Sequence, residues 1–539
     1  MKGVLFGLCV ILLAMEGLVA EGGEMTVKTN NAIRIDVGRQ LFVDDYLIAD
    51  MTLPRSFHTA RLYDKNPVLK PETPVERCVL DLDSNPVAVP FDDGVFYDPK
   101  DHLFKMWYHA GWYDGHCYAE SKDGLSWERP SLDVEPGTNR VLPVRHNTSE
   151  KHQRLLRNGT TVWLDQFAAD PNGRFKMFVY WKRMFDEKTQ GGEIFTSPDG
   201  IHWGAPQRLS TFEFGDNTSF YYDPFRKVWV FSIRRRGVSP VSGHNVRARF
   251  YLANPDFKGF LTAKDSDVVP WLTADKLDKP ETAPDLGYEP ELYKFGAVGY
   301  ESLMVGLYAV FYGPPNEVCE KTKRPKIIDL QVGFSHDGFH FDRPDRRAFI
   351  ACSRTPGTWN RGYLHSAGGI CLIVGDELSF YFGAWSGLSS KRGNYMYAGG
   401  STGLAILRRD GFASLDAGPT PGAVTTKPVC FSGKYPFVNV DAKAGELRME
   451  VLDADGKVIA PFSRDNGIPV KADSTRQKIE WQGASDLYTL SGKPVRFRFH
   501  LTNAKLYSFW VSPETSGASH GYVAAGGPGF TGPTDTTGR

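Results

Sequence analysis

A turn that recurs along the chain constrains the fold more than any other feature of the sequence. The motif SKDGLSW at 121–127 returns as SPDGIHW at 197–203, as SHDGFHF at 335–341 and, in a weaker form, as RRDGF at 408–412. Successive copies begin 76, 138 and 73 residues apart. Because the middle interval is about twice the others, one copy is expected to be degenerate, and LANPDF at 252–257 is the candidate. The spacing therefore predicts five units of roughly 70 residues each.

Each unit repeats the same local pattern. A strand rich in aromatic and apolar residues precedes the turn, as at 104–108 and 175–180. Asp-Pro or Gly-Asp pairs upstream, as at 98–99 and 375–376, indicate hairpins. The Asp-Gly step supplies the positive φ of a tight corner. Helical periodicity is nearly absent, so the chain is expected to be all-β, with a five-bladed β-propeller; unrelated hairpins with shared turn chemistry are the alternative, which the regular spacing disfavours.

The character of the sequence changes after residue 418. Pro419 and Pro421 mark a linker. Four short runs of alternating apolar and polar residues follow, at 446–452, 478–481, 495–501 and 506–511. Such runs are typical of strands in a β-sandwich. We therefore predict a propeller over 33–415, a β-sandwich over 420–512, and a disordered tail over 513–539, where Gly, Pro, Ser and Thr are abundant.

The N-terminus has the form of a secretory signal peptide. Lys2 precedes an apolar run from Val4 to Met15, and Ala20 ends a stretch of small residues. A membrane anchor is the weaker alternative, because the apolar run is shorter than the roughly 20 residues that span a bilayer. Residues 1–20 are therefore predicted to be a signal peptide. We expect the protein to be secreted or periplasmic, without membrane insertion.

Charge and histidine content exclude several classes of partner. Lys+Arg and Asp+Glu both number 63, which gives no reason to expect nucleic acid. The 13 histidines form no HExxH or other close ligand cluster, and no glycine-rich nucleotide loop follows a strand. No metal or other cofactor is therefore expected. Aromatic residues make up 13% of the chain, which suits both sheet packing and the stacking of rings on sugars.

Longer stretches carry a further signal. They are LFVDDYLI at 41–48, GVFYDP at 94–99, FKMWY at 104–108, YESLM at 300–304 and FHLTNAKLYSF at 499–509. Together they resemble glycoside hydrolase family 32, the invertase and fructanase group, and above all secreted bacterial proteins described as family 32-like. The resemblance implies a five-bladed propeller followed by a β-sandwich, and a carbohydrate substrate. The Asn-Asp-Pro-Asn, Arg-Asp-Pro and Glu-Cys boxes of that family are not intact here, so the resemblance supports the architecture better than fructan chemistry.

Hydrolysis of a glycosidic bond generally uses two carboxyl groups, one protonated and one ionised. Glu301 is the candidate acid, because a single carboxylate inside an apolar strand is costly unless it is used or paired, and desolvation would raise its pKa. Asp165, Asp216 and Asp45 are candidates for base, nucleophile or stabiliser. The resemblance implies a stabilising role at the position of Asp165 and a nucleophile near Asp45. The structural alternatives are a strand-end turn at Asp45 and caps at Asp165 and Asp216.

Four further residues in or beside the predicted inner strands are candidates for sugar contacts. They are Trp163, Glu289, Glu291 and His365. Asp92 and Asp93 stand directly before Gly94, and this pattern is interpreted as a hairpin. Three functions remain open on these residues: a secreted glycoside hydrolase, a carbohydrate-binding propeller that has lost catalysis, and an interaction scaffold.

Overall fold

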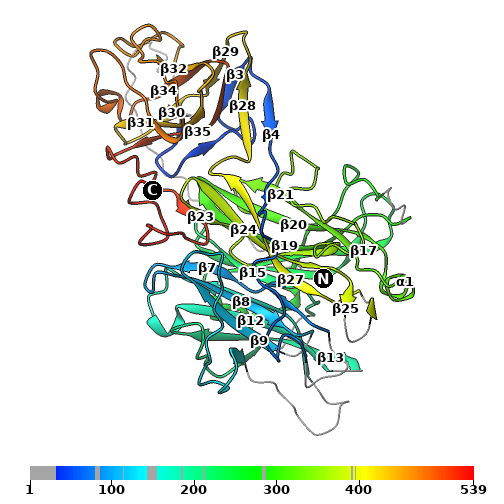
Figure 1. The fold of residues 1–539 in the computed structure, drawn as a ribbon. Helices are drawn as coiled ribbons and strands as arrows, with labels where there is room; N and C mark the ends of the chain where they lie inside the picture. Colours follow the sequence, from blue (N-terminus) through cyan, green and yellow to red (C-terminus); the bar gives the residue numbers. More distant parts are fainter. Residues whose placement is uncertain are drawn as a thin grey trace, which may run out of the picture.

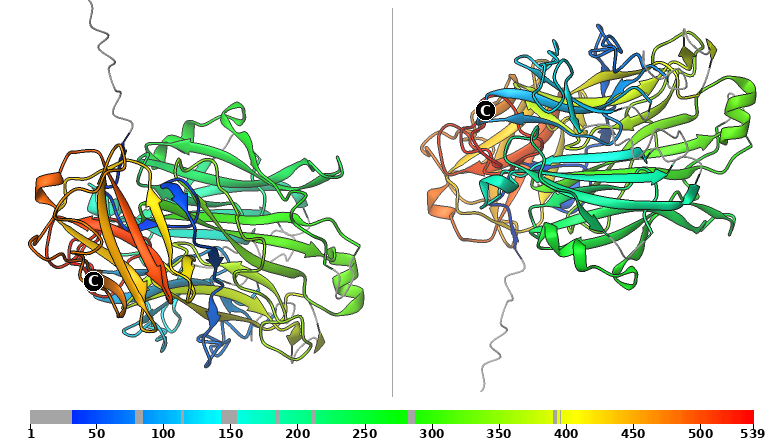
Figure 2. Two further views of the ribbon diagram at one scale, coloured as in Figure 1. Left: turned by 90° about the horizontal axis from the view of Figure 1, so that it is seen from above. Right: turned by 90° about the horizontal axis from the view of Figure 1, so that it is seen from below.

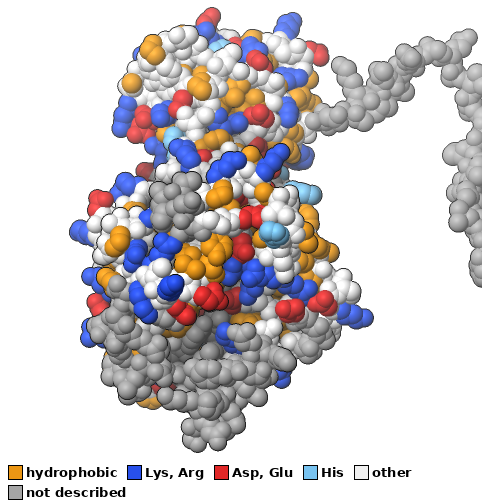
Figure 3. All heavy atoms as spheres, turned by 90° about the vertical axis from the view of Figure 1, so that its right-hand side faces the viewer, with side chains coloured by type: hydrophobic (Ala, Val, Ile, Leu, Met, Phe, Trp, Pro, Cys, Tyr) orange, Lys and Arg blue, Asp and Glu red, His pale blue; other side chains and the backbone are white. Residues whose placement is uncertain are grey.

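A computed structural model gives the fold of the chain (Figure 1). It describes residues 32–78, 85–112, 115–142, 155–183, 186–209, 213–281, 287–389, 393–394 and 396–539. The predicted signal peptide lies outside these residues. The strands form a five-sheet propeller and a two-sheet sandwich, which confirms the predicted fold class. Two further views show the same division (Figure 2), and the surface shows two lobes on which charges of both signs are interspersed (Figure 3).

The first three blades follow one another along the chain. Blade I contains β6 (Ala88–Val89), β7 (Val95–Asp98), β8 (Leu103–Ala110), β9 (Gly115–Ser121) and β10 (Arg140–Leu142). Blade II contains β11 (Leu155–Leu164), β12 (Phe175–Arg183), β13 (Asp186–Ser197) and β14 (Gln207–Leu209). Blade III contains β15 (Ser219–Asp223), β16 (Val228–Val238), β17 (Asn245–Asn254) and β18 (Val269–Leu272).

The last two blades complete the ring. Blade IV contains β19 (Glu291–Glu301), β20 (Leu303–Gly313), β21 (Ile327–Ser335) and the C-terminal β36 (Tyr522–Val523). Blade V contains β22 (Gly362–Ser366), β23 (Leu372–Val374), β24 (Glu377–Trp385), β27 (Gly400–Arg408) and β5 (Arg61–Leu62). Because β5 comes from the N-terminal side of the chain and pairs with β27, it closes the propeller.

The short elements outside the blades are few in the described ranges. They are α1 (Asn316–Thr322), the 3-10 turns η2 (Pro171–Gly173), η3 (Phe257–Thr262), η4 (Asp265–Asp267) and η5 (Tyr488–Leu490), and the pair β25 (Leu388–Ser389) and β26 (Gly393–Asn394).

The repeated turns bond to neighbouring blades. Within a turn, the Asp123 carboxylate accepts hydrogen bonds from the backbone N–H groups of Leu125 (2.7 Å) and Ser126 (2.8 Å). The carbonyl of the turn's glycine then accepts a hydrogen bond from the adjacent blade. Trp107 Nε1 donates to Gly200 O over 2.7 Å, and the Tyr381 hydroxyl donates to Gly124 O over 2.5 Å. The turn that repeats in the sequence therefore provides a hydrogen-bond acceptor for the adjacent blade.

The sandwich recruits strands from both ends of the chain. One sheet contains β1 (Ile33–Arg34), β3 (Ile48–Met51), β29 (Gly422–Thr426), β30 (Val429–Cys430), β32 (Glu446–Asp453) and β34 (Val495–Thr502). The other contains β2 (Gln40–Leu41), β4 (Arg55–Phe57), β28 (Ala413–Ala417), β31 (Tyr435–Asp441), β33 (Asp473–Lys478) and β35 (Ala504–Ser512). The two inner faces enclose a core separate from that of the propeller.

The predicted start of the propeller at residue 33 is therefore wrong. Ile33 pairs in parallel with Val429, and Gln40 pairs with Phe509, so the first four strands belong to the sandwich (Figure 1). Propeller pairing begins only at β5. These N-terminal strands contain two to four residues each, which is too short for an alternating pattern to reveal their partner.

The prediction of a disordered tail at 513–539 is also wrong. Tyr522 and Val523 pair with the end of β19, and Ala525 N donates to Cys371 O over 3.0 Å. Tyr97 N in turn donates to Ala525 O over 2.9 Å, so the segment joins blades I, IV and V. Its glycines permit this approach, since a Cβ at Gly527 would lie 1.8 Å from Ile373 O. The composition that suggested disorder instead lets the chain close one end of the propeller axis.

Candidate active site on the propeller axis

Two adjacent carboxyl groups lie where the inner strands converge. Asp92 and Asp93 occupy the break between β6 and β7, and their exposed fractions are 0% and 1%. Lys294, from β19 of blade IV, forms an ion pair with Asp92 and donates to the backbone carbonyl of Ser366 in blade V. One buried ammonium group thus joins three blades around the carboxyl pair.

Arg249 supplies a second buried cation from blade III. Its guanidinium donates to Asn217 O over 2.9 Å and to Tyr293 O over 3.0 Å. Burial lowers the pKa of Arg249, and the nearby carboxylates of Asp92 and Asp216 partly offset that effect. The charge of Arg249 therefore acts on both the Asp92 carboxyl of blade I and the Asp216 carboxylate of blade III.

Blade II approaches the carboxyl pair closely at Gly159 and adds polar side chains beside it. Gly159 has a φ of +121°, and a Cβ there would lie 3.3 Å from Asn217 N and 3.8 Å from Asp92 Oδ2. Any side chain at this position would therefore reduce the space beside the Asp92 carboxyl. The neighbouring Thr160 hydroxyl lies 2.7 Å from His116 Nε2, and His116 Nδ1 lies 3.4 Å from Asp93 Oδ1.

The environments of these carboxyl groups push their pKa values apart. Burial raises the pKa of Asp92 to about 6, against the opposing charge of Lys294. Burial likewise raises the pKa of Asp93 to about 7. Burial also opposes ionisation of Asp216, but the charges of Arg234, Lys326 and Arg247 outweigh it and hold the pKa of Asp216 below its usual value. Near neutral pH the axis therefore offers both a protonated and an ionised carboxyl group.

An aromatic layer adjoins the charged groups. The Lys326 ammonium lies 5.2 Å from the ring centroids of both Tyr293 and Tyr363 and 5.5 Å from that of Tyr397. The His365 ring lies 4.8 Å from the Tyr363 ring, and burial drives the pKa of His365 well below its usual value. His365 is therefore a neutral imidazole packed among aromatic rings, the nearest being that of Phe91 at 4.3 Å, and its two ring nitrogens can still accept or donate a hydrogen bond.

Several buried polar atoms around the axis have no hydrogen-bond partner. Among the described residues these include both ring nitrogens of His365, the side-chain amide of Asn217 and the hydroxyl of Ser366. Buried polar groups are normally satisfied by protein, water or ligand, and each costs roughly 1–3 kcal/mol if it is not. His365, Asn217 and Ser366 are 0–1% exposed, so water or a ligand would have to enter the axis to satisfy these atoms.

Three of the sequence candidates, Asp216, Glu291 and His365, lie near the cations that surround this site. Asp216 has 27% of its side chain exposed and pairs with Arg234. Glu291 is 14% exposed and pairs with Arg247, whose charge also acts on Asp216. Lys326, whose charge acts on Asp216, also helps to lower the pKa of His365. Glu289, also predicted to contact substrate, accepts hydrogen bonds from the hydroxyls of Ser239 and Ser242 in the loop between β16 and β17.

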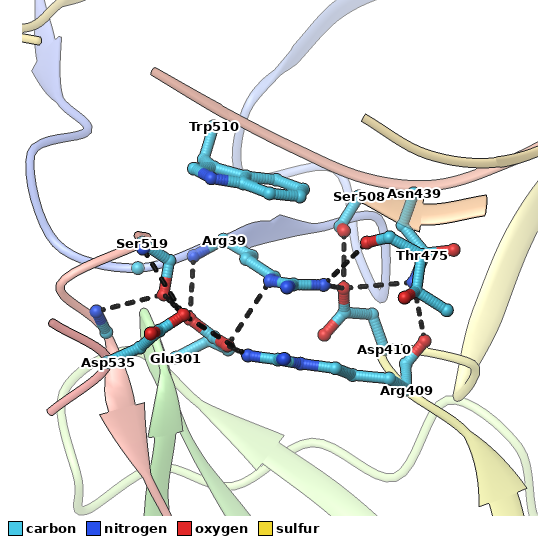
Figure 4. Close-up of polar contacts among 12 residues, drawn as sticks. Arg39, Glu301, Arg409, Asp410, Asn439, Thr475, Ser508, Trp510, Ser519 and Asp535 are labelled. Atoms are coloured by element: carbon cyan, nitrogen blue, oxygen red, sulfur yellow. Dashed lines mark hydrogen bonds and ion pairs between the residues drawn. The ribbon is translucent and has the colours of Figure 1, made fainter. Parts of the chain in front are cut away.

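Glu301 lies elsewhere. It occupies the opposite end of β19 from Lys294, seven residues or about 23 Å along the strand. Its carboxylate lies 3.0 Å from Arg409 and 3.4 Å from Arg39, and the Ser519 hydroxyl donates to it over 2.7 Å (Figure 4). Burial raises its pKa, opposed by the two arginines. Glu301 therefore does not share a pocket with Asp165 and Asp216, contrary to what the sequence led us to expect. The cost of burying its carboxylate is instead offset by the buried ion pairs with Arg39 and Arg409.

The remaining candidates also lie away from the axial site. Asp165 Oδ2 lies 2.5 Å from the ammonium of Lys176, a blade II copy of the 2.9 Å pair between Lys105 and Asp98 in blade I. Trp163 is buried against the rings of Phe96 and Trp229. Asp45 lies in the sandwich, where its side chain is 74% exposed and pairs with Arg55 over 2.5 Å. None of these three adjoins the carboxyl pair.

The residues at the centre of the site are not among the sequence candidates. The Asp-Asp-Gly pattern predicts a hairpin at Asp92 and Asp93, because it is common turn chemistry. Their signal was the position of two carboxylates between fully buried strands, β6 and β7. Lys294 and Arg249 satisfy the criterion that singled out Glu301, since each is a charge within a buried strand.

Metal and membrane features are not found in the described part of the chain. There, no three His, Cys, Asp or Glu side chains form a group that could hold a metal ion. Within the same ranges, no helix combines the length and apolar character needed to cross a bilayer.

No protein-family model matches the chain, and no curated protein does, so the family 32 resemblance stays a prediction. The chain is similar to several solved structures. An N-acetylgalactosamine deacetylase from F. plautii is 12% identical, with a TM-score of 0.42 over 66% of this chain and 95% of that one. A family 43 arabinoxylan arabinofuranohydrolase from Bacillus subtilis is 12% identical, with a TM-score of 0.35 over 83% and 99%. A β-fructofuranosidase from Schwanniomyces occidentalis is 11% identical, with a TM-score of 0.36 over 88% and 98%.

Proposed function

We propose that the protein is an exported glycoside hydrolase whose chemistry takes place at the propeller axis. The observation that carries the proposal is the separation of carboxyl pKa values there, with Asp93 raised to about 7 and Asp216 held below its usual value. This is the pairing of acid and base that glycosidic hydrolysis requires. Export follows from the signal-peptide pattern of residues 1–20.

In this proposal Asp93 is the general acid and protonates the departing glycosidic oxygen. Asp216 is the ionised partner, which either activates a water molecule or attacks the anomeric carbon. A separation of about 6.5–9.5 Å between the two carboxyl groups favours activation of a water molecule, whereas about 5–5.5 Å favours direct attack on the anomeric carbon. Lys294 holds Asp92 in place, while His365 and Asn217 offer hydrogen bonds to sugar hydroxyls.

One observation favours a second candidate, a carbohydrate-binding propeller without turnover. Asp92 and Asp93 are 0% and 1% exposed, and Lys294 already neutralises Asp92. A ligand that reaches only the more exposed Asp216 and Glu291 would be held without contacting an acid. The two candidates therefore differ in whether the carboxyl pair meets the substrate.

A turnover assay distinguishes the glycoside hydrolase from the binding protein without turnover. Release of reducing ends from a panel of plant and algal polysaccharides is measured for the wild type and for Asp93→Asn and Asp216→Asn. Removing an acid or base is expected to lower kcat by about 10²–10⁴-fold, with thermal unfolding confirming that each variant folds. Asp45→Asn, in the exposed sandwich turn, is the matched control. Full turnover by both axial variants would overturn the assignment, and binding without turnover by the wild type would favour the second candidate.

A further inference from the structure

The degenerate copy of the repeated turn lies at the junction of blades II and III, where the inner strands pack but the Asp-Gly turn is missing. At each of the other four junctions, a side chain of one blade donates a hydrogen bond to the Asp-Gly turn of the next. Trp107 and Tyr381 do so at the two junctions of blade I. Between blades III and IV, Arg226 Nη2 donates to Gly338 O over 2.8 Å, and between blades IV and V the Tyr300 hydroxyl donates to Asp410 over 2.5 Å. In blade III the turn is replaced by 252–257, which runs into η3. This segment faces blade II, where the Lys176 ammonium lies 5.9 Å from the Phe257 ring.

A cavity of about 500 Å³ opens at this junction. Its floor is the buried ion pair of Asp165 and Lys176, which are 7% and 8% exposed. Pro255, Asp256 and Phe257 of the degenerate turn form one side. The volume is within the range of small-molecule binding sites, and the cavity lies apart from the carboxyl groups of the axis.

The junction between blades I and II is filled by an arginine that the junction between blades II and III lacks. Arg174 stands directly before Phe175 of blade II, reaches back to blade I and bonds to both carboxylate oxygens of Asp98, Nη1 over 2.8 Å. The residue in the same place before Trp229 of blade III is Val228, which has no such reach. Asp165 is consequently left with Lys176 as its cationic partner, and the groove between blades II and III stays unfilled.

The lining combines aromatic faces with hydrogen-bonding groups. Tyr222 and Trp229 form a wall with ring centroids 4.9 Å apart, and Phe167 is 47% exposed at the mouth, 5.3 Å from Tyr222. At the exposed rim, Asp170 and Asp256 each use one carboxylate oxygen in their own turn, which leaves the second oxygen available as an acceptor. Such a lining suits a ligand with an apolar face and a hydroxyl-bearing edge.

We propose that this inter-blade cavity is a second carbohydrate-binding site, which holds a sugar unit of a neutral polysaccharide away from the axis. Three aspartates and two lysines, Lys176 and Lys258, line the cavity, so the charges nearly balance and favour a neutral ligand. The choice of carbohydrate rests on the proposed function, whereas the cavity does not depend on the axial chemistry. Its role is to anchor a long substrate on the enzyme.

Hydrogen exchange tests the site without reference to turnover. Soluble neutral polysaccharides (xylan, arabinan, galactan and β-glucan) are added to Asp93→Asn, which removes the proposed acid, and backbone exchange is followed by mass spectrometry. We expect slower exchange at 165–176 and at 252–260 with at least one of the four probes. Unchanged exchange in both segments with every probe would overturn the proposal.

Retardation in polysaccharide-containing gels supplies the second test. Phe167→Ala is the informative variant, because the ring is half exposed and its loss leaves the core intact; we expect binding at least tenfold weaker. Tyr488→Ala, a 63% exposed ring on the sandwich, is the matched control and should bind normally. Equal binding by Phe167→Ala and the wild type would refute the site. If Phe167→Ala weakens binding but the wild type hydrolyses no glycan, the proposed function fails and the second binding site stands. If the wild type hydrolyses a glycan but Phe167→Ala binds as tightly as the wild type, the proposed function stands and the second site fails.

Discussion

Replacing Glu301 by Gln is expected to weaken the fold without acting on the chemistry. The substitution keeps the shape of the side chain but removes a fully buried charge that lies 3.0 Å from Arg409 and 3.4 Å from Arg39. Arg39 retains Asp410 at 3.1 Å, whereas Arg409 retains a longer 3.5 Å contact with Asp535 and a hydrogen bond to the Arg539 carbonyl. Breaking a buried ion pair by removing one partner costs about 3–5 kcal/mol, because the other charge is left uncompensated.

The assay is urea denaturation at pH 7, which gives the free energy of unfolding, together with kcat on whichever glycan the wild type cleaves. We expect Glu301→Gln to lose about 3–5 kcal/mol while kcat changes less than a few-fold. Asp45→Asn removes an exposed ion pair with Arg55 and should cost no more than about 1 kcal/mol. An intact free energy of unfolding combined with a hundredfold loss of kcat would refute this account and restore Glu301 as the acid.

Three further predictions concern the axis and the C-terminal segment. Burial raises the pKa of Asp93 from 3.8 to about 7, so between these pH values the folded state keeps a proton that the unfolded state has lost. The stability that this proton contributes is fully present below pH 3.8 and is lost as the pH rises through 7, about 4 kcal/mol in all. Asp93→Asn should therefore flatten this part of the curve of unfolding free energy against pH. Gly159→Ala places a Cβ beside Asp92 at a φ of +121°, so we expect a loss of at least about 1 kcal/mol and weaker glycan binding by calorimetry; unchanged affinity would show that ligands avoid this space. Deleting 513–539 removes the bonds from β36 and Ala525 to three blades and the Ser519 contact with Glu301, so we expect a thermal unfolding midpoint lower by several degrees; an unchanged midpoint would contradict a structural role for the segment.

The number of blades could be predicted from the sequence because each Asp-Gly turn makes local bonds that require particular residues at fixed positions. Asp123 and Gly124 illustrate this, since the carboxylate accepts two backbone N–H groups and the glycine adopts φ of +74°. The partners of β1 and β36 were not predictable in this way. Strands of two residues have no period, and their partners lie far away in the sequence.

The site was predictable only in part, because a charge in an apolar strand signals that it is paired or used without saying which. Asp216 and Glu291 share Arg247 as a neighbouring cation, and Asp216 and His365 share Lys326. Glu301 gives the same sequence signal, but its partners Arg39 and Arg409 are separated from it by 262 and 108 residues, and no local pattern reveals them. A pairing of that kind becomes visible only when the chain is folded.

The most direct test of the axial site is a crystal structure of Asp93→Asn with an oligosaccharide that the wild type cleaves. We expect electron density for a sugar ring at the axis, beside the carboxylate of Asp216 and the rings of Tyr293 and Tyr363. Density confined to the inter-blade cavity beside Phe167 and Tyr222, with the axis closed over Asp92, would contradict an active site among these carboxyl groups.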